Sequence, residues 1–360
     1  SIIMHPKVWE ASGHLDSFGD VMIECKSCNK RLRLDHLIEN KTGQKVEGKP
    51  IKELKQILNE EDIACPHCGN KKFTTPKEFN LLFETSLGSV PEESSTVYLR
   101  GETAQGMFVI YKNIIDSIYP DIPFGLAQIG KAFRNEITLG NFIFRTFEFE
   151  QMEIEYFIRE ENWETEYERW QKIMMDWIID LGVDEENLRL RQHTEDELSH
   201  YSKRTEDIEY KFPFGGFKEL FGFAYRTDYD LKQHEKYSGE NLKYKDKKSK
   251  KEFYPHVVEP TFGVSRTLLV LLLEAFKEEE VNGNQRTYLS FDPRIAPYKV
   301  AVFPLVSNKD KLVNKARGVF EKLNQKFYAT WDDSGNIGKR YRRQDEIGTP
   351  WCVTVDFDKF

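Results

Sequence analysis

The sequence has few of the features that mark an exported or membrane-spanning protein. Cysteine occurs only five times in 360 residues, and no run of about 18 apolar residues occurs anywhere in the chain. The best candidate, 267–276 (T-L-L-V-L-L-L-E-A-F), is too short and carries Glu274, so it predicts a buried helix. No signal peptide opens the chain. We therefore expect no membrane span and a cytoplasmic location, where disulfides are unlikely.

An excess of basic residues is also missing. The chain has 52 lysines and arginines against 60 aspartates and glutamates, a net charge of −8. A nucleic-acid-binding protein usually presents a basic surface, so the charge argues weakly against that class. It does not exclude the class, because a large enzyme can confine its basic surface to one face. The length predicts two or three domains, and 39% hydrophobic residues suffice for a large core.

Four of the five cysteines form two pairs with the same spacing. Cys25 and Cys28 lie in C-K-S-C, and Cys65 and Cys68 lie in C-P-H-C-G. A gap of two residues puts both sulfurs on one side of a tight turn, which suits tetrahedral Zn²⁺. The pairs predict a structural zinc ribbon without an open position for catalysis; buried thiols without metal and a redox pair are the alternatives. The fifth cysteine, Cys352, predicts a buried strand thiol.

The hydrophobic pattern predicts both strands and helices. Apolar and polar residues alternate in 124–133 and 144–157, which predicts two antiparallel strands joined by a loop around 135–141. Segment 163–181 predicts an amphipathic helix that ends at Gly182. Further elements are expected at 1–24 (helix, then turn), 50–59 (helix), 99–119 (strand, turn, helix), 217–229 (strand), 257–274 (strand, then helix) and, after a proline linker, 298–360 (a small α/β module).

Several segments resemble class II aminoacyl-tRNA synthetases. G-K-A-F-R-N-E-I-T (130–138) resembles motif 2, H-V-V-E-P-T-F-G-V-S-R (256–266) resembles motif 3, and M-H-P-K-V-W-E-A-S-G-H (4–14) resembles the end of motif 1. Other segments resemble the glycyl-specific members of the class: Y-L-R-G-E-T-A-Q-G (98–106), F-E-F-E-Q-M-E-I-E-Y-F (147–157), R-T-D-Y-D-L (226–231) and Y-R-R-Q-D-E-I-G-T-P (341–350). The resemblance covers nearly the whole chain, in the right order.

The resemblance implies an α+β fold in which helices flank the antiparallel sheet of class II synthetases. A zinc-ribbon insert and a C-terminal α/β anticodon-binding domain complete it. The implied domains are 1–24 with 69–293 (catalytic, with a helical insert at about 160–210), 25–68 (zinc ribbon-like) and 294–360 (anticodon-binding, incomplete). Neither end of the chain has the character of a natural terminus, so we expect a fragment of a homodimeric enzyme.

The resemblance also implies an ATP site. Formation of an aminoacyl adenylate builds negative charge on phosphorus and pyrophosphate, so the site needs positive charge and positioning rather than a nucleophile. Arg134 matches the motif 2 arginine that bridges the α-phosphate and the amino-acid carboxylate. The implied catalytic residues are Arg134, Arg266 and Glu219. The implied ATP-binding residues are Arg134, Asn135, Glu136, Phe144, Arg145, Phe149, Glu219, Leu220, Gly263 and Arg266.

Individual roles follow from the same resemblance. Glu136, two residues after the motif 2 arginine and therefore on the same side of a strand, is expected to bind the adenine amino group. Phe149 would stack under the adenine, with Arg266 on its other face and also near the γ-phosphate. Arg145 would hold the outer phosphates, and Glu219 would ligate Mg²⁺. The alternative is that the arginines form surface salt bridges.

Glycine offers only an ammonium and a carboxylate, so a specific site must hold these and exclude larger side chains sterically. The implied glycine-binding residues are Arg33, Glu102, Glu150, Gln151, Glu153, Glu259 and Thr261. Arg33 lies in R-L-R-L-D-H, and Thr261 stands where the family usually has serine. For Glu153 and Glu155, a solvated strand face is the alternative.

A few positions depart from the family pattern. Gly101 replaces a common proline, which predicts a looser turn before Glu102. Thr261 adds a methyl group to the wall of the pocket. Val21 stands where motif 1 usually ends in proline, and two phenylalanines make the segment around Gly222 more aromatic than expected, Phe221 and Phe223.

The C-terminal module is expected to contact tRNA(Gly), because anticodon bases are bound by stacking and edge hydrogen bonds. The candidates form the basic and aromatic cluster Lys339, Arg340, Tyr341, Arg342 and Arg343. A solvated basic loop is the alternative. The lysine-rich stretch 245–251 is predicted to be an exposed loop.

Three functions compete. The first is an active glycyl-tRNA synthetase that uses ATP, Mg²⁺ and a structural zinc ion. The second is a synthetase-like binding protein that has lost catalysis, and the third is a synthetase for another small amino acid. The retained arginines and glutamates of motifs 2 and 3 favour an active enzyme, because a binding protein has no need of them.

Overall fold

The computed structural model describes residues 1–46, 48–88, 95–281 and 283–357. The chain forms two compact units, each continuous in space but not in sequence. The first contains Ser1–Met174 and Leu188–Thr267, and the second contains Met175–Asn187 and Leu268–Phe360. Among the described residues, no helix is long and apolar enough to cross a membrane.

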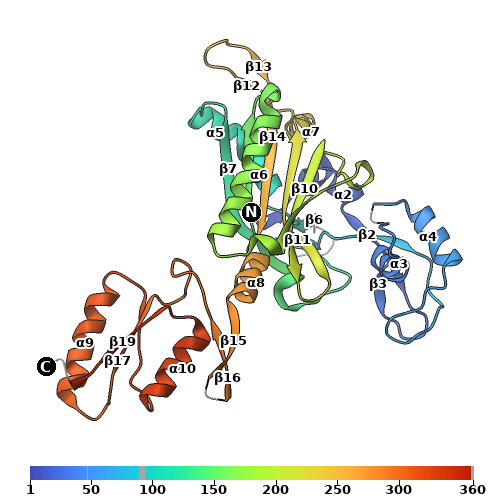
Figure 1. Ribbon diagram of the computed structural model, residues 1–360. Helices are drawn as coiled ribbons and strands as arrows, with labels where there is room; N and C mark the ends of the chain where they lie inside the picture. Colours follow the sequence, from blue (N-terminus) through green and yellow to red (C-terminus); the bar gives the residue numbers. More distant parts are fainter. Residues whose placement is uncertain (47, 89–94, 282, 358–360) are drawn as a thin grey trace. The chain divides into compact units, whose positions relative to one another are not determined.

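A six-stranded sheet is the centre of the first unit (Figure 1). Its strands are antiparallel and lie in the order β7-β8-β14-β11-β10-β9. Their bounds are β7 Phe124–Phe133, β8 Glu148–Ile158, β9 Leu188–Gln192, β10 Arg204–Phe212, β11 Gly216–Thr227 and β14 His256–Gly263. The two alternating segments predicted as an antiparallel pair are β7 and β8, and this prediction is confirmed.

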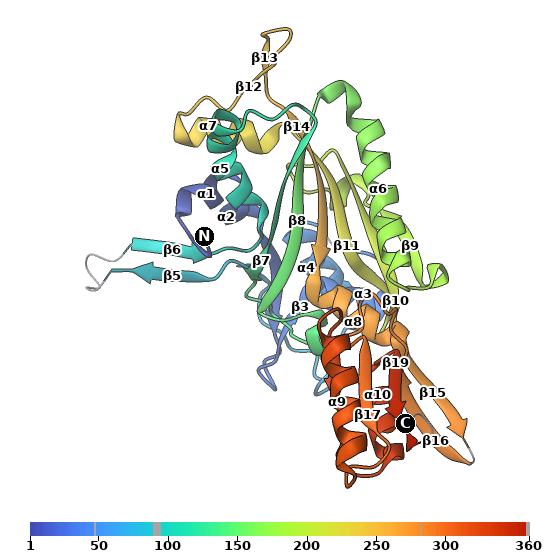
Figure 2. The same ribbon diagram turned by 90° about the vertical axis from the view of Figure 1, so that its left-hand side faces the viewer.

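Helices cover both faces of this sheet, as Figure 2 shows with α6 on one side and α5 and α7 on the other. On α6 (Trp163–Asp180), Trp163 stacks on Tyr225 with ring centroids 4.4 Å apart. On α5 (Ala104–Ser117), Phe108 and Tyr111 pack against Phe157 of β8. α7 (Tyr229–Ser238) lies beside α5. Since strand side chains alternate, the polar residues of β8 that share the face of Phe157 point to the α5 side.

The predicted helical insert at about 160–210 is only half helical. After α6 and the short turn Glu185–Asn187, the chain forms β9 and β10, which complete one edge of the central sheet. Buried acidic residues explain the error: Glu206, Asp207 and Glu209 of β10 are each less than 8% exposed. Because charged residues occupy buried positions here, the apolar alternation that signals a strand is lost.

The N-terminal segment differs from the predicted helix and turn. It forms β1 (Ile3–Met4), α1 (Pro6–Ala11), α2 (His14–Ser17) and β2 (Gly19–Glu24). β2 pairs with β3 (Arg31–Arg33) and β4 (Lys77–Asn80), so the small sheet that carries the cysteine pairs extends beyond the predicted insert 25–68. Helices α3 (Leu34–Thr42) and α4 (Ile51–Glu60) pack on its apolar core. Two hairpins complete the unit, β5 (Glu84–Leu87) with β6 (Ser95–Leu99) and β12 (Tyr244–Lys245) with β13 (Glu252–Phe253).

The second unit is the predicted α/β module with an additional hairpin. Strands β17 (Val300–Pro304), β18 (Ala329–Trp331) and β19 (Trp351–Val355) are parallel, in the order β18-β17-β19. Helices α9 (Asp310–Asn324) and α10 (Ile337–Ile347) connect them. The hairpin β15 (Phe276–Val281) and β16 (Asn284–Leu289) follows α8 (Val264–Ala275) and is tied to α10 by an ion pair of 2.7 Å between Arg286 and Asp345. This unit therefore begins before the predicted boundary at 294.

One predicted tRNA contact, Arg340, is part of the interior. Its side chain is 1% exposed. The guanidinium donates hydrogen bonds to the carbonyl oxygens of Asp333 (2.9 Å), Gly335 (2.7 Å) and Pro304. The basic cluster lies on helix α10, and Arg340 is on its inward face with Gln344 one turn later. Arg340 is therefore a structural residue, and the prediction that it contacts tRNA is wrong.

Replacement of Arg340 should destabilise the second unit. Arg340→Met removes the donors of three backbone carbonyl oxygens, of which that of Pro304 is buried, and this should cost about 2–4 kcal/mol in the free energy of unfolding. Arg342→Met is the matched control, because Arg342 is 43% exposed and pairs only with exposed Glu346; its expected cost is below about 1 kcal/mol. Differential scanning calorimetry of the two variants measures the difference, and equal unfolding temperatures would contradict this account.

Candidate active site

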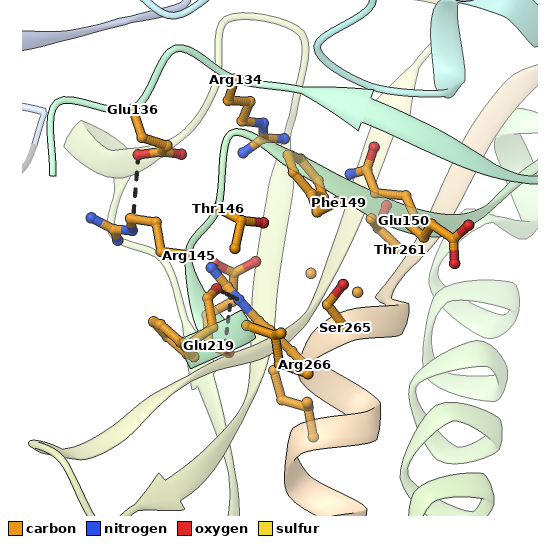
Figure 3. Close-up of a pocket in the computed structure, with 16 residues that line it drawn as sticks. Arg134, Glu136, Arg145, Thr146, Phe149, Glu150, Glu219, Thr261, Ser265 and Arg266 are labelled. Carbon is orange, nitrogen blue, oxygen red and sulfur yellow. Dashed lines mark hydrogen bonds and ion pairs between the residues drawn. The ribbon is translucent and has the colours of Figure 1, made fainter. Parts of the chain in front are cut away.

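A pocket opens in the first unit where the β7–β8 connection, β11, β14 and the start of α8 meet (Figure 3). Most of the residues predicted to bind ATP line it. They are Arg134, Glu136, Phe144, Arg145, Phe149, Glu219, Leu220, Gly263 and Arg266. A second cavity shares Arg134, Arg145, Glu219 and Arg266 with this pocket. We call it the deeper cavity, because it continues to the buried carboxylates that were predicted to bind glycine. The sequence motifs thus converge on one continuous site.

Arg134 is held at the end of β7 by its backbone and its side chain. Its amide donates to the carbonyl oxygen of Phe147 (2.9 Å), and its Nε donates to the carbonyl oxygen of Gly101 (3.2 Å). The guanidinium carbon lies 5.3 Å from the ring centre of Phe149 and 5.1 Å from that of Phe18. The rings of Phe18 and Phe149 and the carbonyl oxygen of Gly101 therefore hold the planar guanidinium group of Arg134 in place at the wall of the pocket.

Glu136 reaches the same pocket in a different way from the predicted one. β7 ends at Phe133, so strand alternation does not place Glu136. The irregular segment that follows turns its carboxylate toward Arg145, with 3.9 Å between Oε2 and Nε (Figure 3). The side chain is in the site, but the predicted physical reason is wrong.

Arg266 projects from the first turn of α8 and pairs with Glu219. Its Nη1 lies 3.0 Å from Glu219 Oε2 and donates to the backbone oxygen of the same residue at 2.8 Å (Figure 3). Its guanidinium lies 4.4 Å from the ring centre of Phe144, whereas Phe149 is covered by Arg134. Although desolvation raises it, the charges of Arg266 and Arg134 lower the pKa of Glu219 below its usual range.

Three arginines lie close enough to influence one another at one end of the site: Arg33, Arg145 and Arg266. Burial lowers the pKa of Arg145, and the charges of Arg33 and Arg266 lower it further, against the opposing effect of Glu136. Burial and then the charge of Arg33 lower the pKa of His36 to about 4. Burial is the largest cause for both groups, and nearby arginines add to it because they repel a further positive charge. An anion such as a polyphosphate would be stabilised here.

The deeper end of the cavity is acidic and buried. Glu102, Glu153 and Glu259 line it and are 6%, 3% and 5% exposed. Glu153 accepts hydrogen bonds of 3.0 Å from the backbone amide of Thr103 and from the Thr261 hydroxyl. Glu155, one alternating position further along β8, is 0% exposed. The alternative of a solvated strand face is therefore wrong for both glutamates of β8.

The residue that balances these carboxylates, Arg226, was not among the site residues predicted from the sequence. Its side chain on β11 is 0% exposed. Nε and Nη2 donate to the two carboxylate oxygens of Asp230 (2.8 and 2.9 Å), and Nη1 donates to Glu259 (2.8 Å). The guanidinium also lies 3.8 Å from the ring centre of Tyr201. The signal was present, because R-T-D-Y-D-L belongs to the resemblance and contains the i, i+4 pair.

Even with this arginine, the acidic cluster holds more carboxyl groups than positive charges. Burial raises the pKa of Glu259 to about 8, and the neighbouring Glu153 and Glu102 raise it against the charge of Arg226. Burial and the charge of Glu259 raise the pKa of Glu155 well above its usual value. Within the part of the chain that the structure describes, neither carboxyl oxygen of Glu155 has a hydrogen-bond partner. A small cation entering this pocket would relieve the repulsion.

The other predicted site residues differ in their burial and in whether they line a cavity. Gln151 and Glu150 both line the pocket of Arg134 and Arg266, but the first is buried and the second is exposed. Arg33 lines the deeper cavity and pairs with Asp20 at 3.2 Å. Asn135 does not line either cavity, and its amide donates to the carbonyl oxygen of Leu81 at 2.8 Å.

The turn before Glu102 is closely packed. A Cβ on Gly101 would lie 3.0 Å from both the Leu82 and the Phe18 side chains. Glycine therefore lets the backbone pass close to two packed side chains here. The prediction of a looser turn than with proline stays a prediction.

The four cysteines form a cluster with two equivalent turns. In each turn the amide after the second cysteine, of Asn29 or Gly69, donates to the carbonyl oxygen of the first at 2.8 Å, and both residues have positive φ (55° and 70°). The sulfurs of opposite turns are 3.5 and 3.7 Å apart. The ligand atoms lie within 4.8 Å of one another: Cys25, Cys28, Cys65 and Cys68. This separation fits four thiolates about 2.3 Å from one Zn²⁺ ion.

Comparisons with known proteins agree with this geometry. Residues 83–275 match the model of the tRNA synthetase class II core domain (G, H, P, S and T), and residues 299–360 match that of an anticodon binding domain. A solved structure, Giardia lamblia prolyl-tRNA synthetase in complex with prolyl-adenylate, has a TM-score of 0.58 over 76% of this chain and 54% of that chain. Its sequence identity is 16%, so it shows likeness of fold. The chain belongs to the class II tRNA synthetases.

Curated relatives narrow the class. The glycine–tRNA ligase of Geobacillus thermodenitrificans is 48% identical over 367 residues, which cover 99% of this chain and 77% of the relative. The glycine–tRNA ligase of Thermobifida fusca is 51% identical over 365 residues, with 99% and 77% coverage. Within the class, the chain belongs to the glycine–tRNA ligase family.

The cysteine cluster makes a prediction about metal content. Freshly purified protein should contain about one zinc ion per chain, because four clustered thiolates complete the tetrahedral coordination of a single Zn²⁺ ion. Inductively coupled plasma mass spectrometry gives the stoichiometry. Replacing Cys28 and Cys65 by serine should remove the metal and lower the unfolding temperature. Wild-type protein without metal would show that the cluster is a set of buried thiols.

Proposed function

We propose that the chain activates glycine with ATP to form glycyl-adenylate and then transfers glycine to the 3′ end of tRNA(Gly). One observation carries this proposal: a cavity with a cationic end and a buried acidic end, on one face of one sheet. Arg134 and Arg266 line one end, and Glu102, Glu153 and Glu259 line the other. ATP phosphates and a glycine ammonium have the complementary charges, so both substrates can meet in one orientation.

The first reaction needs no nucleophile from the protein. The ionised glycine carboxylate attacks the α-phosphorus, a carboxylate–phosphorus bond forms, and the bond to the leaving pyrophosphate breaks. Arg134 would contact both the attacking carboxylate and the α-phosphate, since its fork is held by two rings and a carbonyl. Arg145 and Arg266 would stabilise the charge that develops on pyrophosphate.

Mg²⁺ would neutralise charge on the ATP phosphates. Glu219 fits it, because a half-exposed carboxylate beside the phosphate end is the oxygen donor that a hard cation prefers. Phe149 would support the adenine, and Glu136 lies within reach of its amino group at the rim of the same pocket.

Glycine selectivity would come from charge and lack of space. The ammonium would lie among Glu102, Glu153 and Glu259, all of which are almost fully buried. The hydroxyl of Thr261 is directed to Glu153, which leaves its methyl group as part of the pocket wall. A larger amino acid would place its side chain against buried polar groups, and steric exclusion of this kind requires no editing step.

The second unit would bind the anticodon of tRNA(Gly). Of its predicted contacts, Lys339, Tyr341 and Arg343 are exposed on α10, and Arg342 is half-buried. Arg343 pairs with Asp332 and Arg342 with Glu346, so phosphate contact would exchange these partners. Homodimerisation and a cytoplasmic location stay predictions from the sequence.

Two alternative functions predict different results in an ATP–pyrophosphate exchange assay. A synthetase-like binding protein would catalyse no ATP–pyrophosphate exchange with any amino acid. A synthetase for another small amino acid would exchange with alanine or serine in preference to glycine. A panel of amino acids in one exchange assay separates both from the proposal.

Loss of Arg134 should abolish activation without unfolding the protein. Arg134→Ala should lower kcat for glycine-dependent pyrophosphate exchange about 10²–10³-fold, because an oriented charge at the reacting phosphate is removed. Arg169→Ala is the control, since Arg169 is 48% exposed on α6 and pairs with Glu166. Exchange near the wild-type rate in the Arg134 variant would refute the proposed role.

Glycine binding should release protons at neutral pH. With its pKa raised to about 8, Glu259 is protonated in the free site at pH 7, and the ammonium favours the carboxylate. Glycine affinity should therefore rise between pH 6 and 8. Isothermal titration calorimetry in buffers of different ionisation enthalpy measures the release. A binding enthalpy that is independent of the buffer would contradict the prediction.

A further inference from the structure

Behind the acidic pocket lies a fully buried amide, Gln105. It is the second residue of α5 and is 0% exposed. It lines neither the ATP pocket nor the deeper cavity, so it does not face the substrates directly. Its three polar contacts are to Glu102, Asp230 and His234.

Chemistry fixes the orientation of this amide. Nε2 donates to Glu102 Oε1 at 3.0 Å and to Asp230 Oδ1 at 3.1 Å, and an amide nitrogen can only donate. Both amide protons are therefore used. The amide oxygen lies 2.7 Å from Nε2 of His234, whose pKa is lowered by burial, so the neutral ring donates through this nitrogen. Gln105 cannot rotate without the loss of all three bonds.

Glu102 is held on both oxygens by different parts of the chain. Gln105 donates to Oε1, and Nε2 of His14 lies 3.1 Å from Oε2. His14 is in turn fixed by Ser12, whose Oγ lies 2.8 Å from Nδ1. The carboxylate is thereby prevented from turning, while its remaining lone pairs stay available to the cavity.

The same amide connects the two carboxylates on either side of the pocket. Gln105 binds Asp230, both oxygens of Asp230 accept hydrogen bonds from Arg226, and Arg226 donates to Glu259. A continuous chain of hydrogen bonds therefore links Glu102 with Glu259. All members of this chain are at most 6% exposed.

We propose that Gln105 is a positioning residue for glycine binding: its amide holds Glu102 and Asp230, and through Arg226 also Glu259, at the separation that the ammonium requires. This proposal rests on the proposed function of the pocket. An amide suits the task because it donates two hydrogen bonds without adding charge. A lysine at this position would repel the ammonium, and a carboxylate would repel its neighbours.

Two substitutions test the proposal by steady-state pyrophosphate exchange. Gln105→Met keeps the size but removes both donors, so KM for glycine should rise about 10–100-fold, while KM for ATP stays within about twofold. Gln105→Glu is nearly isosteric. Its new carboxyl group would face Glu102, Asp230, His234 and, beyond Asp230, Arg226.

The pH profile separates positioning from a structural effect. At pH 8 the introduced carboxylate repels its neighbours, whereas at pH 6 its protonated form donates one hydrogen bond. The ratio of variant to wild-type KM for glycine should therefore be smaller at pH 6 than at pH 8 for Gln105→Glu. For Gln105→Met the same ratio should not change with pH. Taking the ratio to wild type removes the titration of Glu259 from the comparison.

Gln171→Met is the matched control, because Gln171 also donates its amide to a buried carboxylate, Glu206, which lines neither cavity. It should leave both KM values unchanged. A glycine KM within about twofold of wild type for Gln105→Met, or equal rises in both KM values, overturns the proposal. So does a Gln105→Glu penalty that is the same at both pH values. Absence of exchange in the wild-type protein would refute the proposed function instead.

Discussion

The buried ion pairs of Arg226 are the interaction on which the acidic pocket depends. Glu102, Glu153, Glu155 and Glu259 lie on neighbouring elements with little solvent, and such a cluster is unfavourable without a counter-charge. Arg226 supplies that charge from the adjacent strand and leaves part of the repulsion unrelieved. Burial, and after it the repulsion that remains among the carboxylates, raises the pKa values of Glu259 and Glu155. Binding of one more positive charge in the pocket would therefore lower the electrostatic free energy of the carboxylates.

The separation of negative from positive charge in the site follows from the elements that carry the charged side chains. Glu153 and Glu155 alternate on β8, and Arg134 and Arg145 come from the connection between β7 and β8. The carboxylates of Glu153 and Glu155 are thus buried, whereas the guanidinium groups of Arg134 and Arg145 line the pocket. A molecule with an ammonium at one end and an ester-forming carboxylate at the other can be bound only one way round in this field.

The two fully buried arginines show how context decides the role of the same residue type. Arg226 binds carboxylates and tunes a ligand pocket. Arg340 binds backbone carbonyl oxygens and connects the start of α10 to the end of β17. The first sets a local charge balance, whereas the second completes the hydrogen bonding of a small α/β unit. Only the partners distinguish them, since both are almost inaccessible to solvent.

Alternation in the sequence predicted the β7–β8 pair, and the resemblance to class II synthetases predicted the class of fold and most of the residues that line the two cavities. These depend on local patterns: strict alternation, cysteine spacing and short motifs whose residues stay close in space because they are close along the chain. The tertiary structure alone decided that Arg226 and Gln105 lie behind the glutamates, that Glu136 reaches the pocket through a turn, and that Arg340 is buried. It also decided that β9 and β10 are strands. Each of these depends on contacts between residues far apart in sequence, where burial and pairing override local propensity.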